Sequence, residues 1–363
     1  MTTIMTASRQ WANRPVDERF TSLLDMQKHF EASRSHSVGR VVASRSLTAS
    51  PVESDDKALV VLGPGNSPVA PTHWSFGQLA QRAGAPASYL RELPAPIAAD
   101  CINYGLKHAR QIEDIGVLLY KNGGPPELRA VTGPNYGRIW NADIVTALVD
   151  RFGDGITGHF RVPGEFGERV DVNKANTTLY ASDRDMFVFL ADEENRIEMA
   201  NRRDGRSGSL ARGFYVWNSE VGKCSYGIAM FLFDYVCCNR IIWGVEAFHE
   251  IRGNHTASAP ERWVEQVAPA IEAYSQASAI PVQQALLAAQ KRKLDDVEQF
   301  LRNRFNATQA RAMMAVHFAE ENRPIETLWD ASTAITAYAR ELPHQDARVE
   351  FERQAGKVLD LAA

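Results

Sequence analysis

The chain has 363 residues, of which 45% are hydrophobic and 23% are charged, and this composition excludes a disordered, collagenous or fibrous protein. Its 40 Lys and Arg residues against 44 Asp and Glu residues give a net charge of -4. A whole-molecule field that attracts nucleic acid is therefore excluded, and any such site must be a local patch. At about 150 residues per domain, the length predicts two domains or one large domain.

Targeting signals and common enzyme motifs are missing from the sequence. Residues 1–12 lack the apolar core of a secretory signal, and the apolar stretch 227–238 is too short to span a membrane. Four cysteines are too few for a disulfide framework. We therefore expect a cytoplasmic protein with no membrane partner. Phosphate-loop, nucleophile-elbow, zinc-protease and CxxC motifs do not occur, so catalysis is left open, a non-enzymatic role is favoured, and no cofactor is expected.

Helix and strand patterns alternate in the first part of the chain. Residues 20–30 predict an amphipathic helix, and strand signals follow at 38–43 and 58–62. Residues 76–93 predict two short helices joined at a glycine, and another helix is expected over 96–109. The 76–93 pair has the spacing of a helix-turn-helix, which serves either as a core hairpin, the favoured interpretation, or as a DNA reader.

The middle of the chain predicts antiparallel strands, with one helix at 141–152 that begins at the N-cap residue Asn141. Two pairs of strand segments are close enough along the chain to form hairpins. The segment after Cys224 is apolar on both alternating faces, which predicts the middle of a covered sheet. The predicted strands are 115–120, 128–131, 177–181, 186–191, 213–218, 223–235 and 241–245.

Beyond Pro260 almost every segment has helical periodicity. The predicted fold class is α+β, with a central, mainly antiparallel sheet, flanking helices and a helical C-terminal region. We expect three regions: an N-terminal helix and strands (1–72), an α+β core domain (73–258) and the helical C-terminal region (259–363). Long amphipathic C-terminal helices predict a homo-oligomer.

Several motifs resemble the phage- and plasmid-borne domain-of-unknown-function family 932. They are SFGQLAQRAGAPASYLRELP (75–94), RAVTGPNY (129–136), VWNSEVG (216–222), VCCNRIIW (236–243) and the segment 328–338. The resemblance runs from residue 75 to the C-terminus. It implies a mobile-element or prophage protein, and it supplies no activity, substrate or catalytic residue.

An arginine-rich segment beside an aromatic strand is the first candidate site. Residues 196–212 contain five arginines against two acids, with interspersed Gly and Ser, and the following strand places two aromatic side chains on one face. Single-strand binders use guanidinium groups for phosphates and rings for bases. The alternative is a solvated loop beside a buried strand. The candidate residues are Arg202, Arg203, Arg206, Arg212, Tyr215 and Trp217.

A second candidate is a group of polar residues at the ends of apolar strands. Such residues close turns or pair within a sheet corner, or they converge on a ligand, with Glu220 and Arg240 as its centre. The candidate pocket residues are Asn218, Glu220, Asn239, Arg240 and His255.

No metal site is expected. The adjacent Cys237 and Cys238 point to opposite faces of a strand, which leaves too few ligands beside His249 and His255.

The leading hypothesis is a non-enzymatic DNA-handling protein that binds single strands in replication, recombination or establishment of a mobile element. The second is an enzyme with its pocket at Glu220 and Arg240. The third is a host-directed interaction protein, such as an inhibitor of a defence system, whose acidic balance suits a basic partner.

Overall fold

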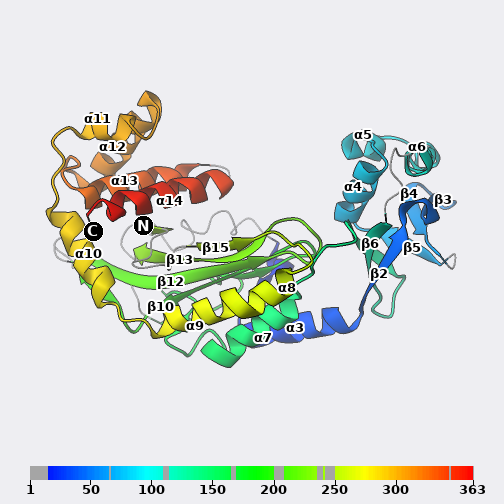
Figure 1. Cartoon of the computed structure of the whole chain (residues 1–363), viewed down its shortest axis with the longest axis horizontal. Helices are drawn as coiled ribbons and strands as arrows, with labels where there is room; N and C mark the ends of the chain where they lie inside the picture. Colours follow the sequence, from blue (N-terminus) through cyan, green and yellow to red (C-terminus); the bar gives the residue numbers. More distant parts are fainter. Residues whose placement is uncertain are drawn as a thin grey trace.

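The computed structural model describes residues 15–64, 67–108, 114–164, 169–199, 208–234, 240–241, 250–342 and 345–362. Figure 1 shows a smaller lobe built from residues 37–132 and a larger lobe that contains most of the remaining elements. Each lobe has its own sheet and its own apolar core. The α+β class is confirmed, with two sheets in place of one central sheet.

The smaller lobe is a mixed sheet covered by three helices. Its strand order is β2-β6-β7-β5-β4-β3; β5 and β7 are parallel, and the other pairs are antiparallel. Strands on both sides of residue 72 share this sheet, so the lobe extends across the boundary expected there. The elements are β2 (Ser37–Ala43), β3 (Thr48–Val52), β4 (Asp55–Leu62), β5 (Pro68–Pro71), α4 (His73–Arg82), α5 (Ala87–Glu92), α6 (Ala95–His108), β6 (Asp114–Tyr120) and β7 (Glu127–Thr132).

The helical pair α4 and α5 serves the core of this lobe, as the favoured interpretation predicted. Phe76, Leu79 and Leu90 are buried against the sheet. Arg91, the arginine of α5, donates to the carbonyl of His73 (2.9 Å) and lies over the ring of Phe76. Its guanidinium is therefore used within the pair.

The larger lobe contains an antiparallel sheet with the order β1-β9-β10-β12-β13-β14, to which β8, β11 and β15 are added. Both sequence-predicted hairpins are present, as β6–β7 and β9–β10. Along β12, every side chain but one is buried, so both faces of this central strand are covered. The strands are β1 (Arg19–Phe20), β8 (Phe160–Arg161), β9 (Leu179–Ala181), β10 (Met186–Asp192), β11 (Ile197–Met199), β12 (Gly208–Asn218), β13 (Tyr226–Asp234), β14 (Arg240–Ile241) and β15 (Glu250–Gly253).

One face of this sheet packs on α3 (Leu23–Ser35), α7 (Asn141–Phe152), α8 (Ala259–Arg262) and α9 (Ala268–Gln276) (Figure 1). The opposite face carries a second set of aromatic side chains, which include Tyr215, Trp217 and Phe231. Gly227 lies across from Trp217, and a Cβ there would come within 2.7 Å of the indole. The glycine thus leaves room for the indole beside the neighbouring strand.

The C-terminal region is helical, as predicted. The helices α10 (Ile280–Lys291), α11 (Val297–Arg302), α12 (Ala307–Glu321), α13 (Leu328–Glu341) and α14 (Gln345–Asp360) enclose a separate apolar core with the ends of β12, β13 and β14. Almost all of α13 is buried, because the other helices pack around it. None of the helices in the described ranges is long and apolar enough to cross a membrane.

The start of α13 depends on a buried carboxylate. Asp330 accepts hydrogen bonds from both Nη atoms of Arg323 and from the backbone N–H groups of Glu326 and Thr327, at 3.0 and 3.1 Å for the latter two. Burial alone would raise the pKa of Asp330, but these donors hold it below its ordinary value of 3.8. The carboxylate therefore stabilises the fold in its ionised form.

We predict that Asp330→Asn lowers the free energy of unfolding by about 2 kcal/mol at pH 6, because the charged partner of Arg323 and part of the cap are lost. A pKa lowered in the folded state gives stability that is present above the unfolded value and lost as pH falls. The difference between wild type and variant in urea unfolding should therefore shrink below about pH 4. The exposed Asp183→Asn is the control, and an equal difference at pH 3 and pH 6 would contradict the assignment.

Candidate functional site

The arginine-rich candidate is only partly described. Arg202, Arg203 and Arg206 lie outside the described residues. Arg212 is 4% exposed, donates through Nη2 to Oδ2 of Asp192 (3.1 Å) and donates through Nη1 to the carbonyl of Ala277. Arg212 therefore belongs to an internal ion pair, and the expectation that it lies on a basic surface is corrected.

The aromatic half of that candidate lies in the core. Tyr215 and Trp217 share one face of β12, as predicted, but they are only 4% and 7% exposed. Trp217 also donates through Nε1 to Oγ of Ser225 (3.3 Å). Because β12 is covered on both faces, neither ring offers a free face to a base in this structure, which corrects the expected stacking role.

The polar turn between β12 and β13 brings two of the predicted pocket residues, Asn218 and Glu220, to the junction of the lobes. Oε1 of Glu220 accepts from the backbone N–H of Asn141 (2.9 Å), and Oε2 lies 3.4 Å from Nη1 of Arg129. Helix α7 begins at Asn141 and has no side-chain cap from its own N-cap residue, Trp140. The Glu220 carboxylate therefore caps α7 from a distant turn and complements the positive end of the helix dipole.

Burial dominates the electrostatics of Glu220. It raises the pKa of the carboxyl above its ordinary value, while Arg129, the N–H of Asn141 and Arg138 oppose the rise. Arg138 donates through Nε to the backbone carbonyl of Glu220 (2.8 Å). The side chain and backbone of Glu220 are thus both engaged by fixed donors, as in a structural clamp.

The rest of the turn fastens the smaller lobe. The carbonyl of Val221 accepts from Nε1 of Trp74 (3.0 Å) and from Nε2 of Gln78 (2.7 Å), both on α4. Its side chain packs with Leu118 and Ala130 from the smaller sheet. The turn 218–223 therefore connects the two lobes, and we call it the junction turn.

The other predicted pocket residues do not converge on Glu220. Asn239 lies outside the described residues, and the backbone of Arg240 pairs with Phe233 near the far end of β13. That position is roughly 20 Å along the strand from Gly227, which lies at the Glu220 end. The expected Glu220–Arg240 pair is therefore corrected to Glu220–Arg129. His255 does reach the junction, where its ring stacks on Tyr136 at 4.8 Å.

The junction also gathers cations and aromatic rings that the sequence analysis missed. Each cation lies over a ring at the separation of a cation–π pair. The residues of this group come from segments that are distant in the sequence, so no local sequence signal marks the group. This junction cluster consists of Arg34 and Trp140 (5.5 Å), Arg138 and Trp140 (5.7 Å), Arg138 and Tyr136 (5.6 Å), Arg129 and Tyr120 (5.8 Å), and Lys223 and Trp74 (5.0 Å).

Within the described ranges no three His, Cys, Asp or Glu side chains are grouped to hold a metal ion. Cys237, Cys238 and His249 lie outside those ranges. The junction cluster is thus a set of cations, rings and hydrogen-bond donors, suited to bind an anion with flat groups.

The sequence model of the family described as Domain of unknown function (DUF932) matches residues 166–354, just over half of the chain. The chain belongs to the DUF932 family. The matched region contains the junction turn 218–223 and most of the C-terminal helices, whereas Arg129, Arg138 and the motif at 75–94 precede it. A search of curated proteins and a search of solved structures found no match. The resemblance to family 932 is confirmed, and the family description names no activity.

We predict that Glu220→Gln lowers the free energy of unfolding by about 3 kcal/mol, because it leaves Arg129 at the junction without its charge partner. The amide oxygen still accepts from Asn141, so Glu220→Ala should cost about 1 kcal/mol more. Urea unfolding at pH 7 measures both. The control is Glu298→Gln, since Glu298 is exposed and pairs with Arg302 on one helix. A Glu220→Gln variant as stable as the wild type would contradict the role of Glu220 as a structural clamp.

We further predict that Trp217→Ala destabilises the protein by about 3–5 kcal/mol, the range for removal of a large buried ring. The cause is an empty space above Gly227 and the loss of contact with Tyr215. Thermal and urea unfolding provide the measurement. A variant as stable as the wild type that selectively loses oligonucleotide binding would show that the indole is a surface group.

Proposed function

We propose that this DUF932 protein is a cytoplasmic DNA-handling protein of a phage or plasmid, which binds single-stranded DNA without catalysis. The observation that supports this function best is the junction cluster, where half-buried rings and cations from both lobes lie together.

The first step in the argument is electrostatic. The net charge of -4 requires a local site for a polyanion. At the junction, the carboxylate of Glu220 is buried and bound to fixed donors. Its negative charge therefore attracts few cations from the solvent. Lys223 is exposed and makes no ion pair with any described residue. Its ammonium is therefore available to a phosphate.

The second step compares two interactions of the same ring. An exposed cation–π pair contributes about 0.5–1 kcal/mol, whereas a base stacked on an aromatic side chain contributes about 1–3 kcal/mol. When Lys223 turns toward a phosphate, the face of Trp74 is released for a base, whereas Arg34 must also leave its ion pair with Asp143. At Trp74 a single strand thus gains more than the cluster loses.

The arginine-rich segment supplies a second set of cations. Arg202, Arg203 and Arg206 precede Gly208, the first residue of β12, whereas the junction lies beyond Asn218, its last residue. The two ends of this strand are roughly 35 Å apart. Variants of the arginine-rich segment and of the junction cluster are therefore tested separately.

The geometry favours binding over catalysis at Glu220. Both of its carboxylate oxygens face fixed partners, and Arg240 lies toward the other end of β13. The alternative enzyme hypothesis loses the pair of groups on which it depended.

We predict that fluorescence anisotropy will detect single-stranded oligonucleotides bound at low salt, with weaker binding at near-physiological salt. Arg34→Ala combined with Lys223→Ala should lower the affinity about tenfold. It should also reduce the slope of log K against log salt by about 0.7 for each lost phosphate contact. Arg202→Ala, Arg203→Ala and Arg206→Ala together test the arginine-rich segment.

The matched control is Arg302→Ala with Lys291→Ala. Arg302, like Arg34, pairs with an exposed acid, and both control residues are exposed on the C-terminal helices. Absence of binding at low salt would refute the proposed function, since electrostatic attraction is strongest there. Equal losses in the control and the junction variant would refute the junction as the site.

A further inference from the structure

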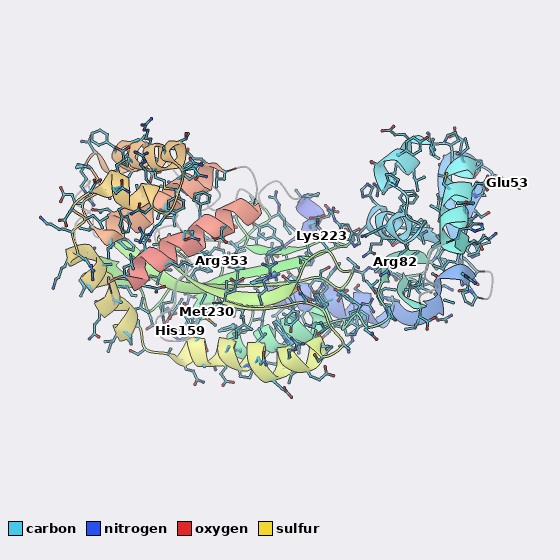
Figure 2. The ribbon with its side chains drawn as sticks, turned by 45° about the horizontal axis from the view of Figure 1, so that its top comes forward. Glu53, Arg82, His159, Lys223, Met230 and Arg353 are labelled. Atoms are coloured by element: carbon cyan, nitrogen blue, oxygen red, sulfur yellow. The ribbon has the colours of Figure 1, made fainter. Side chains whose placement is uncertain are left out.

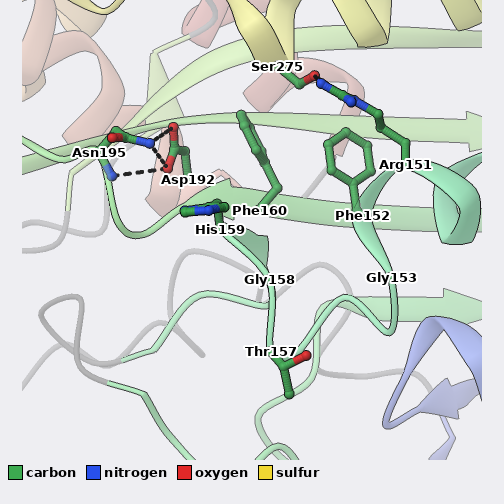
Figure 3. A pocket seen from close by; sticks show the side chains of 10 residues that line it. All are labelled: Arg151, Phe152, Gly153, Thr157, Gly158, His159, Phe160, Asp192, Asn195 and Ser275. Carbon is green, nitrogen blue, oxygen red and sulfur yellow. Dashed lines mark hydrogen bonds between the residues drawn. The ribbon is translucent and has the colours of Figure 1, made fainter.

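A cavity of about 470 Å³ lies at the edge of the larger sheet (Figure 3). Its walls come from the end of α7, the loop before β8, the turn between β10 and β11, and the end of α9. Figure 2 labels His159 beside this cavity and Lys223 beside the smaller lobe, well separated in the molecule. The volume falls in the range of small-molecule sites.

Two phenyl rings give the cavity an apolar wall. Phe152 and Phe160 line it with ring centroids 5.3 Å apart, and Phe214 supports both rings from within the core. Their planes are inclined by 49° and the side chains are 8% and 4% exposed, so they form a preformed apolar wall that a ligand ring can meet edge-on.

Arg151 is held in a defined orientation at the top of the cavity (Figure 3). It donates to Oγ of Ser275 through Nε (2.9 Å) and Nη2 (2.7 Å), while that hydroxyl donates to the carbonyl of Glu272 (2.8 Å). A guanidinium has five N–H donors, so three remain, including the pair on the outer Nη1–Nη2 edge. That edge matches two oxygens of a phosphate.

The charge of Arg151 is not offset nearby: it forms no ion pair with any residue in the described ranges. The carboxylate in the cavity wall, Asp192, accepts from the backbone and side-chain nitrogens of Asn195 and from Arg212. Asp192 is therefore neutralised and its oxygens are occupied. His159 is bound through Nδ1 to Glu194 (2.5 Å), which leaves its Nε2 open. The cavity thus combines an apolar wall with one cation that forms no ion pair with a described residue.

We propose that this cavity binds a nucleotide, with the base in edge-on contact with Phe152 and Phe160 and the phosphate on the outer edge of Arg151. A nucleotide is chosen over other aromatic anions because of the proposed DNA-handling function, on which this inference rests. The phosphate-bearing nucleotide comes from one of two sources, a free nucleoside monophosphate or the 5′-phosphorylated end of a strand.

Isothermal titration calorimetry with AMP tests the proposal. Two further probes are adenosine, which lacks the phosphate, and ribose 5-phosphate, which lacks the base. Arg151→Gln should weaken AMP binding about tenfold or more and leave adenosine binding unchanged, because it removes a charged hydrogen-bond donor from the phosphate alone. Ser275→Ala keeps the charge of Arg151 but removes the hydroxyl that orients its guanidinium. The affinity for AMP should therefore fall several-fold. Arg302→Gln is the control.

No heat of binding with AMP at millimolar concentration would overturn the proposal, as would equal AMP affinity in wild type and Arg151→Gln. Competition by a 5′-phosphorylated oligonucleotide, but not by its 5′-hydroxyl form, would support the strand end as the source. Competition by neither, with AMP bound, would support the free nucleotide. Failure here is separable from failure of the proposed function, because the Arg34 and Lys223 variant should still bind AMP.

Discussion

The arrangement of this protein depends on one buried carboxylate. Glu220 satisfies the first N–H of α7 and lies against Arg129 of the smaller sheet, while its backbone carbonyl holds Arg138. Helix α7 packs on the larger sheet, so the same residue fixes a helical layer of one lobe and an inner strand of the other. A buried charge is costly unless it is paired, and this requirement brings the start of α7 and Arg129 of the smaller sheet together at the junction.

The double covering of the larger sheet determines where function can lie. Side chains on both faces of β12 are buried, which turns an apparently exposed aromatic strand into core. In the larger lobe, places where strands end and connecting segments meet are therefore the better candidates for binding a ligand. The junction cluster and the Phe152–Phe160 cavity both lie at such places.

The parts of the fold that were predictable are those with local causes. The hairpins β6–β7 and β9–β10 join segments separated by a few turn residues, and the C-terminal helices carry their own periodicity. The Glu220–Arg129 pair could not be predicted, because it joins segments 91 residues apart through the packing of two lobes. Likewise Arg240 is near Glu220 in the sequence, but strand register places it toward the other end of β13.

Both proposed sites follow from how this chain distributes its charge. Arg212, Arg161 and Arg323 each meet a carboxylate and thereby stabilise the fold. Arg151 and Lys223 are instead held by a serine hydroxyl and by an indole, neither of which cancels their charge. A carboxylate at either place would orient the cation equally well but would compete with an incoming phosphate. Neutral partners keep the cation in position and leave its charge available, which is the requirement for binding an anion in a protein whose net charge is negative.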